Sequence, residues 1–264
     1  MPDHLPRPAT PGRLVAHRGA SLAAPENTLA AFAAARGLGI RWVEFDVSLL
    51  GDGTAVVHHD ATLERCTDTA GPLSAIERAD LARIGAGRRF GGAWAGEPIP
   101  TLTATLDFLE AAGMSANLEM KPQGADPGPL AETVAGALAE RDWTRAHVLV
   151  SSFSAEALAA LAPALPGQPL ALLVDAPEPG WPEHVAALGA GALHMNWRRL
   201  APAHLEAAEA SGLDLRVYTA NEPEALAPLR RPGLTGVITD DPAAFLADPD
   251  WAAWALAPQA AKRP

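Results

Sequence analysis

The stretch WVEFDVS, residues 42–48, has the alternation of a β-strand with one acidic face. Side chains two residues apart on a strand point to the same side, so Glu44 and Asp46 share a face. The residues that flank these acids are Trp42, Val43, Phe45 and Val47, which is typical of a strand packed on its neighbours. We therefore predict a central strand that presents two carboxylates to one side. A half-exposed edge strand with two solvated acids is the alternative interpretation.

Similar apolar runs alternate with Ala- and Leu-rich segments along almost the whole chain. The eight candidate strands are Arg13–His17, Arg41–Ser48, Ala116–Lys121, His147–Phe153, Pro169–Val174, Ala192–Asn196, Asp214–Thr219 and Gly236–Thr239. The intervening segments have helical spacing of apolar residues, as in Leu29, Phe32 and Ala33. Strands that are mostly each followed by a helix predict an α/β fold, a (β/α)8 TIM barrel. In a barrel, the acids of residues 42–48 would point towards the axis. A doubly wound open sheet is the alternative.

One segment interrupts the alternation. Residues 51–101 are rich in Gly, Pro and Arg and contain only a short strand-like piece at Ala55–His58. We interpret this segment as a small insertion after strand 2 that caps one end of the barrel. The sequence thus predicts a single catalytic domain over residues 13–250 that includes the insertion. The ends, residues 1–12 and 258–264, are expected to be loosely held tails.

Composition narrows the classes of function. The formal charge is 20 − 31 = −11, so binding to nucleic acid or to an anionic membrane surface is not expected. The single cysteine, Cys66, excludes an intrachain disulfide and fits a reducing compartment. No signal peptide is apparent in the first residues, and no apolar stretch approaches the roughly 18–20 residues that span a bilayer. We expect a soluble cytoplasmic protein, either a monomer or a homodimer, that acts on a small molecule.

A second acidic strand follows the insertion. In ANLEMKP, residues 116–122, Glu119 and Lys121 are again two apart. If this strand lies beside residues 42–48, Glu119 approaches Glu44 and Asp46. Carboxylates about 4 Å apart would repel by roughly 4 kcal/mol per pair at an effective dielectric constant of 20. A hard divalent cation, Mg²⁺ or Ca²⁺, would relieve this repulsion. The alternative for Glu119 is an ordinary ion pair with Lys121.

Two histidine-containing stretches supply further candidates. In AHRGASLAAPENT, residues 16–28, His17 ends the first strand at the rim where barrel active sites lie. Arg18 offers a planar fork for phosphate oxygens. His58 and His59 are adjacent, so only one of them readily faces the site, and the strand pattern does not choose between them.

Four ordered motifs, HRGASLAAPENT, VEFDV, HDATLER and NLEMKP, resemble the glycerophosphodiester phosphodiesterase family in its short bacterial cytosolic form. VYTAN at residues 217–221 and GVITDDP at residues 236–242 resemble the last two strands of that family. The resemblance covers residues 14–242. It implies a (β/α)8 barrel with a small insertion after strand 2, as the alternation of elements also predicts.

The resemblance also implies roles for individual residues. His17 and His59 match the histidines that serve as general acid and base, which selects His59 over His58. The matching metal ligands are Glu44, Asp46 and Glu119. Arg18 and Lys121 match positions that meet the phosphate, and Asn27 matches a supporting polar position.

Two aromatic residues extend the candidate site. Tyr218 stands where relatives often have Trp, and it could affect which alcohol groups are accepted. Trp197, at the end of strand 6, is expected to pack against the glycerol or the leaving group. The chain also has Asp241 where a basic residue is common, which does not affect the catalytic set.

The activity implied is metal-dependent hydrolysis of a glycerophosphodiester to sn-glycerol 3-phosphate and an alcohol. The family resemblance suggests that a neighbouring glycerol hydroxyl attacks phosphorus, giving a cyclic phosphate that water then opens. Two alternatives are a related barrel lysophospholipase D or phospholipase, and a non-catalytic barrel that binds phosphodiesters. The acidic composition disfavours the lipase, and the intact set of charged residues disfavours the non-catalytic barrel.

Overall fold

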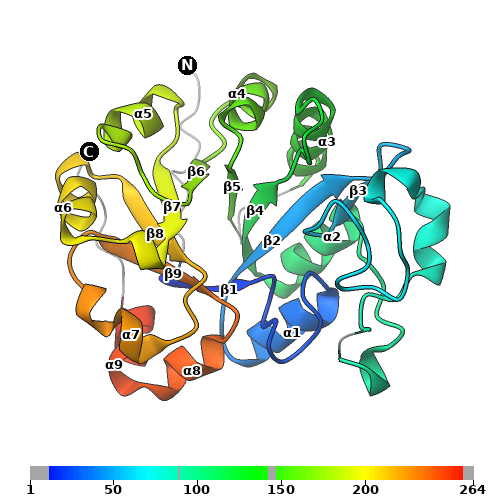
Figure 1. The fold of residues 1–264 in the computed structure, drawn as a ribbon, viewed down its shortest axis with the longest axis horizontal. Helices are drawn as coiled ribbons and strands as arrows, with labels where there is room; N and C mark the ends of the chain where they lie inside the picture. Colours follow the sequence, from blue (N-terminus) through cyan, green and yellow to red (C-terminus); the bar gives the residue numbers. More distant parts are fainter. Residues whose placement is uncertain (1–11, 89, 142–146, 258–264) are drawn as a thin grey trace.

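The computed structural model of the protein describes residues 12–88, 90–141 and 147–257. Its centre is a closed barrel of parallel strands, visible in Figure 1. The strands are β1 (Leu14–His17), β2 (Trp42–Leu49), β4 (Ser115–Met120), β5 (Val148–Ser152), β6 (Leu170–Val174), β7 (Ala192–Asn196), β8 (Asp214–Tyr218) and β9 (Leu234–Thr239). They follow the order β1-β9-β8-β7-β6-β5-β4-β2, and pairing of β1 with β2 closes the ring. This closure excludes the open sheet.

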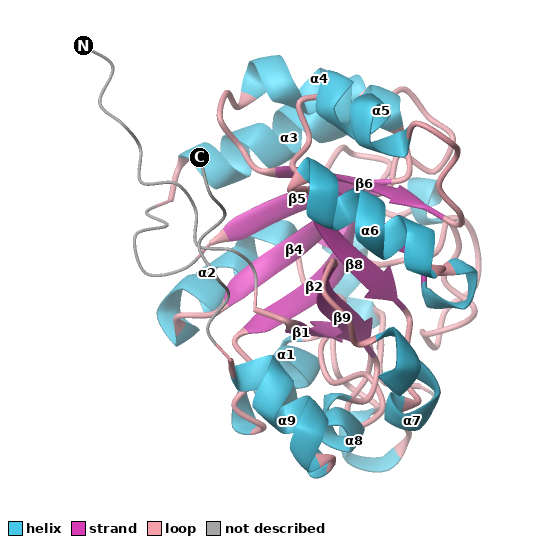
Figure 2. Ribbon diagram, turned by 90° about the vertical axis from the view of Figure 1, so that its left-hand side faces the viewer, coloured by secondary structure: helices cyan, strands magenta, loops and turns pink. Residues whose placement is uncertain are grey.

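Helices surround the strands, as Figure 2 shows. They are α1 (Leu29–Gly37), α2 (Leu102–Ala112), α3 (Gly128–Ala139), α4 (Ala155–Ala164), α5 (Trp181–Ala187), α6 (Pro202–Ser211), α7 (Pro223–Leu226), α8 (Pro242–Ala247) and α9 (Pro249–Leu256). The main hydrophobic core contains residues from both the helices and the strands, such as Phe32 of α1 and Phe45 of β2. A smaller apolar cluster includes Val15, Leu149 and Ile238. Among the described helices, none is long and apolar enough to cross a membrane.

The segment after β2 has its own short elements and its own apolar cluster. Strand β3 (Ala55–Val57) pairs antiparallel with β2, and three 3-10 helices follow: η1 (Leu73–Ala75), η2 (Arg78–Arg83) and η3 (Gly92–Trp94). The cluster includes Val56, Leu63 and Leu81. In Figure 1 this segment lies at the right, beside β2 and β3.

The observed strands begin and end within two residues of the candidate strands. The tails expected at residues 1–12 and 258–264 lie outside the described residues except for Gly12.

Candidate active site

Three carboxylates meet on neighbouring strands at one side of the barrel. In the parallel pairing of β2 with β4, Asp46 is opposite Glu119, and Glu44 lies two residues before Asp46. One oxygen from each of the three side chains lies within 4.8 Å of the others, and all three residues are buried. The same-face arrangement of the two acids of β2 and the approach of Glu119 are therefore both observed.

Two cations compensate part of this negative charge. The Nζ of Lys121 lies 2.6 Å from Glu119 Oε1 and 3.5 Å from Asp46 Oδ1. The backbone N–H of Arg18 donates to Glu44 Oε2 at 3.1 Å, and its guanidinium Nε lies 3.2 Å from Asp46 Oδ2. The ion pair of Glu119 with Lys121 is thus present together with the carboxylate cluster.

The environment separates the pKa values of the three acids. Burial, together with the charges of Asp46 and Glu119, raises the pKa of Glu44 well above its ordinary value. Burial and the charge of Asp46 raise the pKa of Glu119 to about 7. Burial would also raise the pKa of Asp46, but Arg18 and Lys121 outweigh it and lower that pKa. The cluster therefore resists carrying three negative charges without a further cation.

The carboxylate cluster fits a hard divalent cation. Glu44 Oε1 and Asp46 Oδ1 are buried and have no hydrogen-bond partner among the described residues. Buried carboxylate oxygens without partners are costly, and an oxygen-binding cation would satisfy them. Oxygen donors without thiolates or imidazoles are the set that Mg²⁺ and Ca²⁺ prefer.

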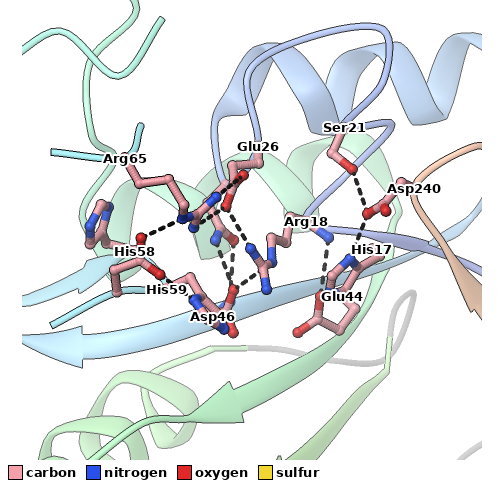
Figure 3. Close-up of polar contacts among 12 residues, drawn as sticks. His17, Arg18, Ser21, Glu26, Glu44, Asp46, His58, His59, Arg65 and Asp240 are labelled. Atoms are coloured by element: carbon pink, nitrogen blue, oxygen red, sulfur yellow. Dashed lines mark hydrogen bonds and ion pairs between the residues drawn. The ribbon is translucent and has the colours of Figure 1, made fainter. Parts of the chain in front are cut away.

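His17 ends β1 beside this cluster, as Figure 3 shows. Its Nδ1 lies 2.6 Å from Asp240 Oδ1, and its Nε2 lies 3.7 Å from Glu44 Oε2. Ser21 Oγ and Asn221 Nδ2 also donate to Asp240, at 3.0 and 2.7 Å. Burial alone would raise the pKa of Asp240, but these contacts, led by that of His17, lower it to about 2. The aspartate is therefore a charged partner that holds one ring nitrogen.

His59, in the segment after β3, is held in the same way. Its Nδ1 lies 2.6 Å from Asp60 Oδ1, and Arg65 Nε donates to the second oxygen of Asp60. Burial, and the positive charges of Arg18 and Lys121, lower the pKa of His59. A histidine that is neutral near pH 7 can act as a base.

Arg65 also connects this segment to the loop after β1. Its two terminal nitrogens donate to both oxygens of Glu26, at 2.6 and 2.8 Å. Glu26 in turn accepts from Arg18 Nη1 at 2.7 Å. A continuous chain of charged contacts therefore runs from His59 through Asp60, Arg65 and Glu26 to Arg18.

The backbone after β1 is shaped to place these groups. Arg18 and Asn27 have φ angles of 56° and 59°, in the left-handed region. Gly19 has a φ of 81°, and a Cβ there would lie 2.6 Å from the backbone carbon of Ala31, so only glycine fits against α1. Asn27 Nδ2 donates to Asp46 Oδ2 at 2.8 Å, and the N–H of Asp46 donates to Asn27 Oδ1 at 3.2 Å.

Most of the expected site residues line one cavity, which we call the mouth cavity. Its volume is about 180 Å³, and its wall includes His17, Arg18, Glu44, His59, Glu119, Lys121 and Tyr218. Asp46 is completely buried and is not among the residues that line the cavity. Tyr218 packs edge to face on Phe153, and its hydroxyl donates to the carbonyl of Val174 at 2.8 Å.

Trp197 and His58 do not line the mouth cavity. Trp197, in η4 (Trp197–Arg199), is not among the lining residues of the mouth cavity, and it packs partly on the main core. His58 is buried, with Nε2 3.0 Å from the carbonyl oxygen of Thr62. His59 is therefore the histidine of this pair that faces the mouth cavity.

Several residues of the site were absent from the sequence-based set. Asp240, Asp60, Glu26 and Arg65 hold the histidines and Arg18, and Asn117 lines the floor of the mouth cavity. Neither polar atom of the Asn117 amide has a hydrogen-bond partner among the described residues. The alternation that identified Glu119 also placed Asn117 on its face, so the sequence did contain a signal for this residue.

The comparisons with known proteins agree with this geometry. The profile of the glycerophosphoryl diester phosphodiesterase family matches residues 17–244. The chain is 32% identical over 232 residues to a glycerophosphodiester phosphodiesterase of Caldanaerobacter subterraneus subsp. tengcongensis, covering 87% of this chain and 94% of that protein. It is 29% identical over 252 residues to a glycerophosphodiester phosphodiesterase of Bacillus subtilis, covering 88% of this chain and 84% of that one.

Solved structures of phosphodiesterases are also similar to this chain. A phosphodiesterase of Oleispira antarctica, solved in complex with the product sn-glycerol-3-phosphate, superposes with a TM-score of 0.84 at 32% identity, covering 87% of this chain and 93% of that one. A glycerophosphodiester phosphodiesterase of Agrobacterium tumefaciens superposes with a TM-score of 0.73 at 28% identity, covering 90% of this chain and all of that one, 100%.

Proposed function

Since this chain belongs to the glycerophosphoryl diester phosphodiesterase family, we propose that it releases sn-glycerol 3-phosphate from glycerophosphodiesters with the aid of one divalent cation and two histidines. The proposal depends most on one observation: three buried carboxylates lie together, and two of them, Glu44 and Glu119, line the same cavity as His17 and His59. The product bound to the Oleispira antarctica relative supports the choice of product.

Glu44, Asp46 and Glu119 would hold the cation, either Mg²⁺ or Ca²⁺. When bound, such an ion supplies Lewis-acid activation of a hydroxyl and stabilisation of charge on a phosphate. Arg18 and Lys121 bind the phosphate oxygens in this proposal, because their cationic groups border the same cavity. Their positive charge also favours the additional negative charge of the transition state.

The two histidines move the protons. One takes the proton of the glycerol hydroxyl next to the ester, and that oxygen bonds to phosphorus while the bond to the leaving alcohol breaks. The other gives a proton to the departing alkoxide. Water then opens the cyclic phosphate, which yields sn-glycerol 3-phosphate. Asp240 and Asp60 hold the Nδ1 side of each ring, so Nε2 is the atom available to substrate.

The proposal includes a small-molecule substrate and a cytoplasmic location. The single cysteine supports that location, because secreted proteins commonly contain disulfides.

A kinetic comparison tests the roles of the histidines. His17→Ala and His59→Ala should each lower kcat by roughly 10²–10⁴-fold, the range typical of a general acid or base. The assay follows sn-glycerol 3-phosphate release from glycerophosphocholine, glycerophosphoethanolamine and glycerophosphoglycerol with Mg²⁺ or Ca²⁺ present. His184→Ala is the matched control, because His184 is exposed on the outer helix α5. Near-normal kcat in both site variants would contradict the assignment, and no product from any of the three diesters would contradict the function.

A further inference from the structure

A second cavity opens beside the mouth cavity. We call it the side cavity; its volume is about 410 Å³, and it lies between the loop after β1 and the segment after β2. Two residues, His17 and Arg18, line both cavities. The carboxylates of Glu44 and Glu119 line only the mouth cavity. The two cavities therefore meet at a catalytic histidine and a phosphate-binding arginine of the proposed function.

The charged groups of the side cavity are already paired with one another. Glu26 accepts from both Arg18 and Arg65, and Arg65 also donates to Asp60. Asp240 is in contact with His17 and accepts from Ser21 and Asn221. The two carboxylates and the two guanidinium groups of this wall also balance in charge.

Beside these paired charged groups, the side cavity also presents apolar side chains to a ligand. Leu22 and Phe90 are 63% and 38% exposed, and both line the side cavity. Pro25, Cys66 and Ala86 complete this apolar lining. Large exposed apolar side chains that gather at a concave surface mark a binding site more often than isolated ones do.

We propose that the side cavity receives the leaving alcohol of the substrate and favours alcohols with a methylated or otherwise apolar surface. The inference rests on the proposed function. A phosphodiester carries two arms on one phosphorus atom, and the groups assigned to the phosphate lie where the two cavities meet. The glycerol arm belongs in the mouth cavity, because its reacting hydroxyl must be near the carboxylate cluster. The second arm is then directed into the side cavity.

The charged side chains that line the side cavity are already paired with one another, and this determines which leaving alcohol the cavity favours. Choline and ethanolamine both carry one positive charge, so a wall of balanced charge does not distinguish them by charge. They differ in that ethanolamine has three N–H donors where choline has three methyl groups. Three of the roughly four acceptor positions on each of the carboxylates of Glu26 and Asp240 are already in use. They therefore offer few hydrogen bonds to replace those that an ammonium group loses on leaving water. Methyl groups gain from contact with Leu22 and with the ring of Phe90.

The test compares two substrates that differ only in this group. For the native protein, kcat/KM for glycerophosphocholine should exceed that for glycerophosphoethanolamine by about tenfold, as burial of several methyl groups would give. Phe90→Ala and Leu22→Ala should each bring this ratio towards one, mainly by raising KM for glycerophosphocholine. Their kcat values should change little, because neither side chain meets the reacting atoms. Leu38→Ala is the control, because Leu38 is 39% exposed at the end of α1 and does not line either cavity.

The outcomes separate this inference from the function on which it rests. If native protein hydrolyses both diesters with equal kcat/KM, and if Phe90→Ala and Leu22→Ala leave both values unchanged, the side cavity does not hold the leaving alcohol. An equal rise in KM for both substrates would mean that these side chains contact a shared part of the substrate, which also overturns the proposal. Failure of native protein to release sn-glycerol 3-phosphate from either diester would instead overturn the proposed function.

Discussion

Each of the two histidines of the site is held at Nδ1 by an aspartate. Asp240 directly follows β9, whereas Asp60 is the neighbour of His59 in the chain. A carboxylate at Nδ1 fixes the orientation of an imidazole ring and leaves Nε2 for proton transfer. In the proposed mechanism, two rings held in this way would approach one phosphate from positions that do not depend on bound substrate, which would reduce the reorganisation needed during the reaction.

A third buried histidine leads to a prediction on acid stability. His194 of β7 is completely buried, and burial together with the charge of Arg216 lowers its pKa to about 3. Below pH 6.5 the unfolded chain therefore binds a proton that the folded protein does not bind, so stability falls as the pH falls from about 6.5 towards 3. Between pH 7 and pH 5, His194 should cost the native protein about 2 kcal/mol of unfolding free energy.

Urea denaturation of native protein and of His194→Leu at these two pH values measures this cost. All other titrating groups are shared, so the difference in pH dependence reports His194 alone. The variant should lose about 2 kcal/mol less stability on acidification than native protein. The same pH dependence in both proteins would contradict the assigned pKa.

The alternation of strands predicted the acidic residues of the site but not the residues that support them. Glu44 and Asp46 follow from a two-residue period, which is a local property. The approach of Glu119 follows from the expectation that the next parallel strand lies beside residues 42–48. The contact of His17 with Asp240 joins residues 223 positions apart and exists only because the barrel closes. The choice of His59 came from the family resemblance, because β3 ends at Val57 and strand alternation does not extend to the histidines.

At the level of elements, Arg65 adds a charged connection between the segment after β2 and the loop after β1, beside the pairing of β3 with β2. The ion pairs of Arg65 with Glu26 and Asp60 connect that segment to the loop after β1. Arg65→Met should therefore lower the free energy of unfolding by about 1–3 kcal/mol, the range for lost charged hydrogen bonds at a partly exposed position. It should also lower kcat, because Asp60 and Glu26, which hold His59 and Arg18, both lose a partner.

Two measurements check this prediction. Urea denaturation of Arg65→Met, Glu26→Gln and the double variant gives the coupling energy, which should be about 0.5–3 kcal/mol for residues in contact. Arg83→Met serves as the control, because the Arg83 side chain is 80% exposed on η2 of the same segment. Coupling close to zero would show that the ion pairs do not fasten the segment.

The elements themselves differ in how well they could be predicted. The barrel strands were found within two residues because their apolar runs have the length of strands and alternate with longer segments of helical spacing. Of the segment after β2, only the first strand was predicted from the sequence. The 3-10 helices η1, η2 and η3 are too short to show a helical period of apolar residues. Its apolar cluster, with Val56, Leu63 and Leu81, draws on residues spread over the segment without regular spacing.

For the whole molecule, the pairing of β2 with β4 concentrates negative charge at one place. The chain has a formal charge of −11, and three of its carboxylates are buried together beside β2 and β4. Arg18 and Lys121 balance only part of that charge, which keeps the pKa values of Glu44 and Glu119 raised. The folded protein therefore contains an unfavourable electrostatic contribution that a bound cation would remove.

Cation binding should consequently stabilise the whole fold. A ligand that binds only the folded state at about 100 times its Kd adds about 2.7 kcal/mol of stability. For a chain of this size each kcal/mol corresponds to about 2–4 °C, so saturating Mg²⁺ or Ca²⁺ should raise the midpoint of thermal unfolding by roughly 5–10 °C. Chelation by EDTA should reverse the increase. The measurement is thermal unfolding followed by circular dichroism, which does not depend on catalytic activity.

Two variants decide whether the carboxylate cluster is responsible for this response. Glu119→Gln removes one proposed ligand while keeping the shape of the side chain, so the shift of the midpoint with cation should shrink to a small fraction of the native value. Glu209→Gln removes a carboxylate that is exposed on α6, and it should respond as native protein does. An equal shift in Glu119→Gln and native protein would place the stabilising cation elsewhere on this acidic chain. A shift that only Glu119→Gln loses would connect the thermal stability of the barrel to the same three carboxylates on which the proposed chemistry depends.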